Sequence, residues 1–274
     1  MTIKNKLKYL PLELYGRLHE TLQFERFARS FVPSINHVRV ICYHDIPERD
    51  LPLFEKQIVF FKKEYTIINA GQLKNFFLGK GFLPNANIFI TFDDGSTDQY
   101  KAAEVLDQHK IQGCFFVNTG DRDKRFINAR PGTKLSPMTW DQIKDLYRRG
   151  HTIGSHTATH PNLSRLQPYE IGQEMQESKK ALETLIGDKV EFFAFPYGTL
   201  RELGQDALLI AKKYYDFNFL FVSGKCHFES ANRFLITRTG VGSRDSLYSL
   251  RAVMTGLKDW PKTTERERLR ELLC

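Results

Sequence analysis

Short apolar runs alternate with helical stretches along most of this chain, and that alternation limits the folds open to it. The apolar runs predict strands at residues 38–43, 65–69, 88–92, 114–117, 151–154, 190–195, 217–222 and 234–237. Amphipathic stretches predict helices at 53–63, 97–109, 139–149 and 168–186. Several strands lack polar alternation, as expected where a parallel sheet is covered on both faces. The order predicts an α/β fold, either a barrel or an open sheet.

Three regions are expected along the 274 residues. Residues 1–36 form an amphipathic helical extension, residues 37–256 the main α/β domain, and residues 257–274 a charged helical tail. The extension is expected either to pack on the main domain or to rest on a membrane surface, as its basic flank allows. No signal peptide and no transmembrane helix are predicted, because no apolar stretch is long enough.

The net charge of +8 is compatible with a polyanionic partner, but the basic residues are scattered. No zinc finger, phosphate-binding loop or RNA-binding signature accompanies them, so a nucleic-acid partner is not expected. The four cysteines are widely spaced, which favours reduced thiols over disulfides or a zinc ribbon.

Two adjacent carboxylates, Asp93 and Asp94, follow the apolar run that ends at Phe92. Burying charge there is costly unless the carboxylates bind a cation or take part in catalysis. Neighbouring side chains in a strand point to opposite faces, so the two can converge only if the chain turns. Gly95 supplies the backbone freedom for that turn, although a surface loop rich in Asp and Gly would explain the same residues.

A second group of polar residues, Ser-His-Thr-Ala-Thr-His-Pro, follows another predicted strand. His156 and His160 are four residues apart and can reach one metal ion from a single turn. With a carboxylate they make a ligand set that binds zinc in several hydrolytic sites and leaves a position for water. Other divalent ions accept the same set, which is also the facial triad of non-haem iron oxygenases.

A third motif, Pro196-Tyr197-Gly198, follows the run at 190–195. A turn there could direct a backbone N–H at a tetrahedral oxyanion. Taken alone, such a turn is common and weakly informative.

The order of these motifs resembles the polysaccharide deacetylase family, which shares the NodB homology domain. The resemblance covers residues 38–242, and it is nearest to the poly-N-acetylglucosamine deacetylase branch, through Tyr43-His44-Asp45, Trp140, Gly150-His151 and Arg238. It implies a distorted, incomplete (β/α) barrel.

The resemblance also implies roles for particular residues. Asp93 is the general base, and Asp94, His156 and His160 hold one divalent metal ion, Zn²⁺ first, with Co²⁺, Ni²⁺ or Mn²⁺ as alternatives. The Tyr197 N–H assists the oxyanion, and Pro196, Tyr197 and Gly198 contact the substrate. The ion acidifies water and polarises the acetyl carbonyl.

Two departures from the family pattern leave roles open. Ala194 stands where many members have an arginine, and Arg238 is the expected replacement that reaches the same aspartate from another strand. The Leu-x-His element that usually supplies the general acid is absent. His44 and His227 are the remaining candidates for that acid.

The leading hypothesis is hydrolysis of N-acetyl groups on an N-acetylglucosamine-type saccharide or glycan precursor, lipid-linked or nucleotide-linked. An O-acetyl esterase, an iron oxygenase and a catalytically silent carbohydrate-binding domain are the alternatives. The expected location is cytoplasmic, with peripheral contact to the inner membrane surface through the N-terminal segment. The oligomeric state is open.

Overall fold

The computed structural model describes residues 36–81, 83, 86–120, 136–256 and 259. Strands and helices alternate through this part of the chain. The strands are β1 (His37–Tyr43), β2 (Thr66–Ile67), β3 (Ala86–Phe92), β4 (Cys114–Val117), β5 (Thr152–Ser155), β6 (Phe192–Ala194), β7 (Phe217–Phe219), β8 (Cys226–His227) and β9 (Arg238–Gly240). The helices are α3 (Leu51–Glu64), α4 (Ala70–Phe77), α5 (Thr97–Gln108), α7 (Trp140–Arg148), α8 (Pro168–Ile186), α9 (Leu200–Tyr214) and α10 (Leu247–Thr255).

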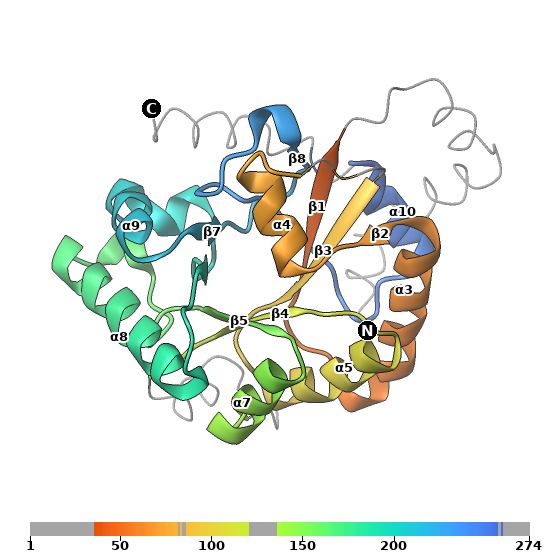
Figure 1. Ribbon diagram of the computed structural model, residues 1–274, viewed down its shortest axis with the longest axis horizontal. Helices are drawn as coiled ribbons and strands as arrows, with labels where there is room; N and C mark the ends of the chain where they lie inside the picture. Colours follow the sequence, from red (N-terminus) through yellow and green to blue (C-terminus); the bar gives the residue numbers. More distant parts are fainter. Residues whose placement is uncertain (1–35, 82, 84–85, 121–135, 257–258, 260–274) are drawn as a thin grey trace, which may run out of the picture.

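Apart from the short β8, which pairs antiparallel with β1, the strands form a nearly closed parallel barrel. Their order is β7-β6-β5-β4-β3-β1-β8, and β9 also pairs with β1. A parallel bridge between Phe219 of β7 and Ile236, just before β9, brings the two ends of the sheet together. Helices α3, α5, α7, α8 and α9 follow one another around the outside of the strands (Figure 1). The predicted distorted (β/α) barrel is therefore confirmed.

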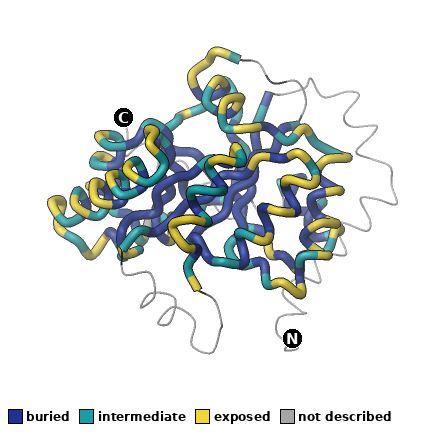
Figure 2. The backbone as a smooth tube through the Cα atoms, turned by 60° about the horizontal axis from the view of Figure 1, so that its bottom comes forward, coloured by how far each residue is buried: buried dark blue, intermediate teal, exposed yellow. Residues whose placement is uncertain are grey.

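Alternate residues of the strands face two different apolar layers. On β1, Val38 and Val40 belong to the cluster inside the barrel, whereas Ile41 and Tyr43 belong to the larger cluster beneath the helices. Figure 2 shows the buried strands at the centre and the exposed positions on the outer helices. This two-residue alternation decides which side chains enter the barrel at the ends of its strands.

Helix α4 packs on the apolar interior of the barrel (Figure 1). Its start is stabilised by a capping box, in which Asn69 and Gln72 each bond the other's backbone N–H. Leu73, Phe76 and Phe77 are buried in the interior cluster. The strands in this layer are thus covered on both faces, as their continuous apolar character predicts.

The strand predicted at 234–237 is displaced along the chain. Phe234 and Leu235 belong to a turn whose N–H groups bond the side chain and carbonyl of Asn232, whereas Ile236 makes the bridge to Phe219 and β9 begins at Arg238. The strand predicted at 217–222 ends at Phe219. Helices α4, α9 and α10 were not predicted.

The predicted N-terminal extension at 1–36 and the charged tail at 257–274 lie almost wholly outside the described residues. Among the helices that are described, none has the length and apolar character needed to cross a membrane.

Candidate metal centre and active site

A sharp turn follows β3, and in it the side chains of Asp93 and Asp94 point in different directions. Asp94 and Gly95 both have positive φ angles, of 87° and 71°. A Cβ at position 95 would also lie 3.1 Å from Cγ1 of Val117, a tight contact that would require the Val117 side chain to shift slightly. The turn buries Asp93 inside the barrel and leaves the Asp94 side chain 16% exposed.

Asp94, His156 and His160 lie together at the carboxyl ends of β3 and β5. Oδ1 of Asp94 is 3.6 Å from Nε2 of His156 and 3.6 Å from Nε2 of His160. All three ligand atoms lie within 4.8 Å of one another. Two ligands bound to one zinc ion at roughly 2.1 Å in tetrahedral geometry are separated by roughly 3.4 Å, so the donor set fits a divalent ion.

Both imidazoles are held by the loop that carries them. Nδ1 of His156 donates to the carbonyl oxygen of Ala194 at 2.7 Å, which leaves Nε2 to face Asp94. Thr157 and His160 adopt positive φ angles of 66° and 57°, and the His160 N–H bonds Oγ1 of Thr157 at 3.0 Å. Outer contacts of this kind orient metal-binding histidines and set their tautomer.

Asp93 is paired with Arg238, as expected of the residue that replaces the missing arginine. The two guanidinium nitrogens donate to its carboxylate oxygens at 2.5 and 2.7 Å, and both side chains are buried. Burial by itself would raise the pKa of Asp93, but Arg238, aided by His156 and His44, holds that pKa well below its usual range. Asp93 is therefore a buried carboxylate that stays ionised.

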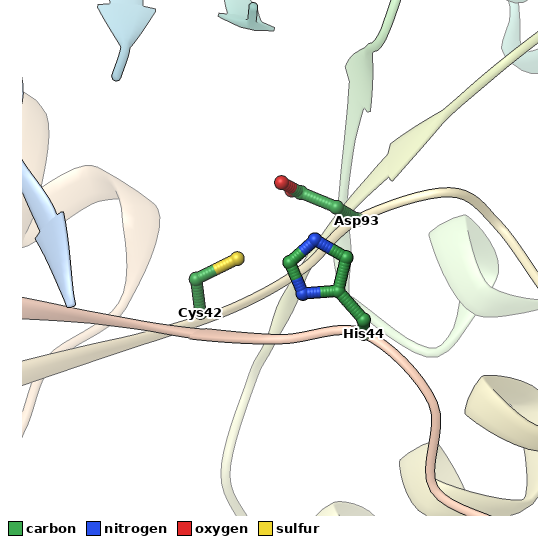
Figure 3. Close-up of side chains that lie close together, drawn as sticks. All are labelled: Cys42, His44 and Asp93. Carbon is green, nitrogen blue, oxygen red and sulfur yellow. The ribbon is translucent and has the colours of Figure 1, made fainter. Parts of the chain in front are cut away.

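His44 and Cys42 complete the surroundings of Asp93. Donor atoms of these three residues lie within 4.8 Å of one another, and the side chains converge in Figure 3. The His44 ring packs edge-on against Phe221, with centroids 5.5 Å apart. His44 is thus placed to exchange a proton close to Asp93. Cys42 was not predicted at this site from the sequence.

Gln99 is a second residue that the sequence analysis missed. From the first turns of α5, its buried Nε2 donates to the carbonyl oxygen of His44 at 2.7 Å and to that of Asp93. It therefore ties the loop after β1 to the turn after β3. Its position in the helix that follows the Asp-Asp-Gly turn was the available sequence signal.

Pro196, Tyr197 and Gly198 form a tight turn beside the His160 imidazole. The Gly198 N–H bonds the Pro196 carbonyl at 2.6 Å, and a Cβ on Gly198 would collide with the backbone nitrogen of Phe221. Tyr197 has a φ of 60°, and its half-exposed ring lies 4.9 Å from the His160 ring. The turn therefore lies beside one member of the Asp94, His156 and His160 group.

His227 does not lie at this site. It pairs with His37 at the start of β1, whereas His44 follows the end of that strand. Seven residues of extended chain separate the two positions by roughly 20 Å. Of the two histidines considered for the general acid, only His44 lies beside Asp93.

A family model described as polysaccharide deacetylase matches residues 81–214. The match includes Asp93, Asp94, the two candidate ligand histidines and the Pro-Tyr-Gly turn. His44 and Arg238 lie outside it, on the strands that complete the barrel.

Two curated relatives carry deacetylase names. The peptidoglycan-N-acetylglucosamine deacetylase of Bacillus cereus is 29% identical over 119 residues, which are 43% of this chain and 38% of that protein. The chitooligosaccharide deacetylase of Bradyrhizobium is 30% identical over 101 residues, 36% of this chain and 39% of that protein. The chain thus spans about two fifths of these relatives' length.

The fold has a solved counterpart. The deacetylase PplD of Streptococcus pyogenes, determined in complex with acetate, superposes with a TM-score of 0.66 and 21% identity, covering 80% of this chain and 98% of that one. The shared fold, the family match and the names of the relatives agree. Residues 81–214 are therefore similar to the polysaccharide deacetylase family, and the described part of the chain has the fold of a solved deacetylase.

Proposed function

We propose that this chain is a metal-dependent deacetylase that removes acetyl groups from the amine of an N-acetylglucosamine-type saccharide. The observation that carries the proposal is an ionised carboxylate, Asp93, that precedes Asp94 of the ligand group in the chain and lies close enough to His156 for their charges to interact. The names of the two curated relatives supply the substrate class.

The ligand group supports a single divalent ion. Two imidazole nitrogens and one carboxylate oxygen favour Zn²⁺, and Co²⁺, Ni²⁺ and Mn²⁺ accept the same donors. When bound, such an ion would lower the pKa of a water molecule and polarise the acetyl carbonyl.

Asp93 would act as the general base. Its charge is maintained by Arg238, so it can accept a proton from water at neutral pH. Both of its oxygens already accept from Arg238, which fixes the plane of the carboxylate and leaves one further lone pair on each oxygen. The pairing would therefore orient the base without occupying it.

The other two roles fall to His44 and Tyr197. His44 would donate a proton to the departing amine, because its imidazole is half-buried and lies close to Asp93. The Tyr197 backbone N–H has no bonded acceptor within the described part of the chain, and the left-handed turn presents it beside His160. It would donate to the developing oxyanion.

An assay of released acetate tests this function. Protein reconstituted with one equivalent of Zn²⁺ would be incubated with N-acetylglucosamine oligomers and with O-acetylated sugars, alongside Asp93→Asn. Acetate from the N-acetyl substrates, formed without oxygen and absent in the variant, is expected. Acetate from the esters alone would make the chain an O-acetyl esterase, and no acetate from any substrate would leave a carbohydrate-binding domain.

A further inference from the structure

A second group of potential metal ligands lies at the carboxyl ends of β1 and β3. It consists of the Cys42 thiol, the His44 imidazole and the Asp93 carboxylate, whose donor atoms all lie within 4.8 Å of one another (Figure 3). Deacetylation as proposed above uses His44 and Asp93 but has no use for a thiol. The presence of Cys42 therefore needs its own explanation.

The pairing of β1 with β3 brings these side chains together. The two strands run parallel with Cys42 opposite Thr91 and Tyr43 opposite Phe92. Because side chains alternate along a strand, Cys42 and His44 share one side of β1, and Asp93 continues the same side of β3. The convergence follows from the register of the barrel and does not require a special loop.

Sulfur, imidazole nitrogen and carboxylate oxygen are all zinc ligands, at roughly 2.3, 2.1 and 2.1 Å. Ligands at those lengths in tetrahedral geometry lie roughly 3.5 Å apart, so each donor would move by about 1 Å or less from its present place. His44 is only half-buried and gives an ion access from solvent. A thiol makes this group more selective for soft cations than the group around Asp94.

Charge makes this second group the weaker one. Arg238 already neutralises Asp93 with two hydrogen bonds, and it would repel a cation nearby. Binding also requires the buried Cys42 thiol to lose its proton, which burial opposes. The Asp94 group, a carboxylate and two imidazoles, needs no thiol to lose its proton and should fill first.

We propose that Cys42, His44 and Asp93 form a second, lower-affinity site for thiophilic divalent cations such as Zn²⁺, Co²⁺ and Cd²⁺. Binding releases the Cys42 proton to solvent and forms a metal–thiolate bond, with no change of oxidation state. If the deacetylase function holds, occupation of this site inhibits the enzyme, because it takes the base and the candidate acid together. The binding itself does not depend on that function.

Cobalt titration of the metal-free protein tests the binding. Two equivalents of Co²⁺ are expected to bind, the first giving only ligand-field bands in the visible spectrum and the second adding a thiolate-to-cobalt charge-transfer band in the near ultraviolet. Cys42→Ser should bind one equivalent without the charge-transfer band. Cys226→Ser removes another buried thiol, at the opposite end of β1 from Cys42. This variant should bind two equivalents and show the charge-transfer band.

His156→Ala separates the two sites, because it removes a ligand of the first and none of the second. The charge-transfer band should persist in this variant. Absence of the band from the unmodified protein in excess Co²⁺ would overturn the proposal, and that result does not depend on whether any variant folds. Survival of the band in folded Cys42→Ser would overturn it equally.

The regulatory consequence is measured by acetate release. Excess Zn²⁺ should reduce the rate of the unmodified protein at least tenfold below its rate at one equivalent, whereas Cys42→Ser should lose less than twofold relative to its own rate at one equivalent. Equal inhibition of both proteins would remove the inhibitory role. A protein that releases no acetate yet shows the charge-transfer band would contradict the deacetylase function alone.

Discussion

Arg238 and Asp93 form a two-point ion pair between strands that are 145 residues apart in the chain. Both side chains are buried, and the guanidinium group also lies 5.2 Å from the centre of the Phe116 ring inside the barrel. The pair links β9, which closes the barrel, to the turn that carries the proposed base. One contact therefore couples barrel closure to the charge state of the site.

Arg238→Met should destabilise the metal-free protein by about 3–5 kcal/mol at pH 7, because it leaves a buried carboxylate without its partner. In the unmodified protein, the lowered pKa of Asp93 contributes stability above the carboxyl's unfolded pKa, and this is lost as pH falls through the folded value. In the variant, burial raises that pKa, so protonation relieves the cost. Denaturant titrations should therefore show that the difference in unfolding free energy between Arg238→Met and the unmodified protein is smaller at pH 5 than at pH 7.

Arg39→Met is the matched control for this effect. Arg39 is likewise fully buried and makes two hydrogen bonds to one carboxylate, that of Asp259, but its partner is partly exposed. The control should lose stability without a comparable narrowing at low pH. If the two variants showed the same pH dependence, the Arg238 effect would not reflect the Asp93 charge.

Asp93→Asn should lower the rate of acetate release at least about 100-fold, the usual contribution of a general base. The variant should still bind one equivalent of metal at the Asp94 group, as measured by elemental analysis of dialysed protein. Asp50→Asn serves as the control, since Asp50 is a buried carboxylate paired with Arg244 at the start of α3, outside the ligand group. Normal rates for Asp93→Asn would exclude it as the base.

His156→Ala should abolish binding of the first metal equivalent in the micromolar range and with it acetate release, because it removes one of three donors and the contact to the Ala194 carbonyl. Isothermal titration with Zn²⁺ measures the loss. His109→Ala removes a histidine that pairs with Glu55 on the outer helices and should bind metal normally. Retention of tight binding by His156→Ala would place the metal elsewhere.

The sequence was most informative where ligands are close in the chain. The histidine pair and the paired aspartates each follow a single strand, so local spacing and strand ends were enough to predict that they would meet. The alternation of apolar runs and helices predicted an α/β fold, either a barrel or an open sheet, and the family resemblance narrowed this to the distorted barrel. The prediction of the site used local patterns together with the rule that parallel strands present their carboxyl ends at one edge.

The remaining features depend on distant registers. Cys42 joins the site only because β1 is aligned with β3 in one particular register, and neither strand alone specifies that alignment. The strand predicted at 234–237 was misplaced, because Asn232 accepts hydrogen bonds from the N–H groups that follow it and holds the start of this apolar run in a turn. Gln99 was not predicted because it bonds backbone carbonyls, and every residue type carries such a carbonyl, so no sequence motif identifies the contact.

Gln99→Met should reduce the rate of acetate release roughly 10-fold or more with little change in KM, because it removes both hydrogen bonds that hold the His44 loop against the Asp93 turn while keeping the side chain's length. Among the described residues the buried Gln99 side-chain oxygen accepts no hydrogen bond, so the amide contributes through its nitrogen alone. Gln57→Met is the matched control: Gln57 is equally buried and bonds three backbone carbonyls in the loop at 242–245. It should lose stability, with a smaller effect on the rate of the folded enzyme. Steady-state kinetics at a temperature where both variants remain folded would decide, and a Gln99→Met enzyme with an unchanged rate would show that the two loops hold their positions without this amide.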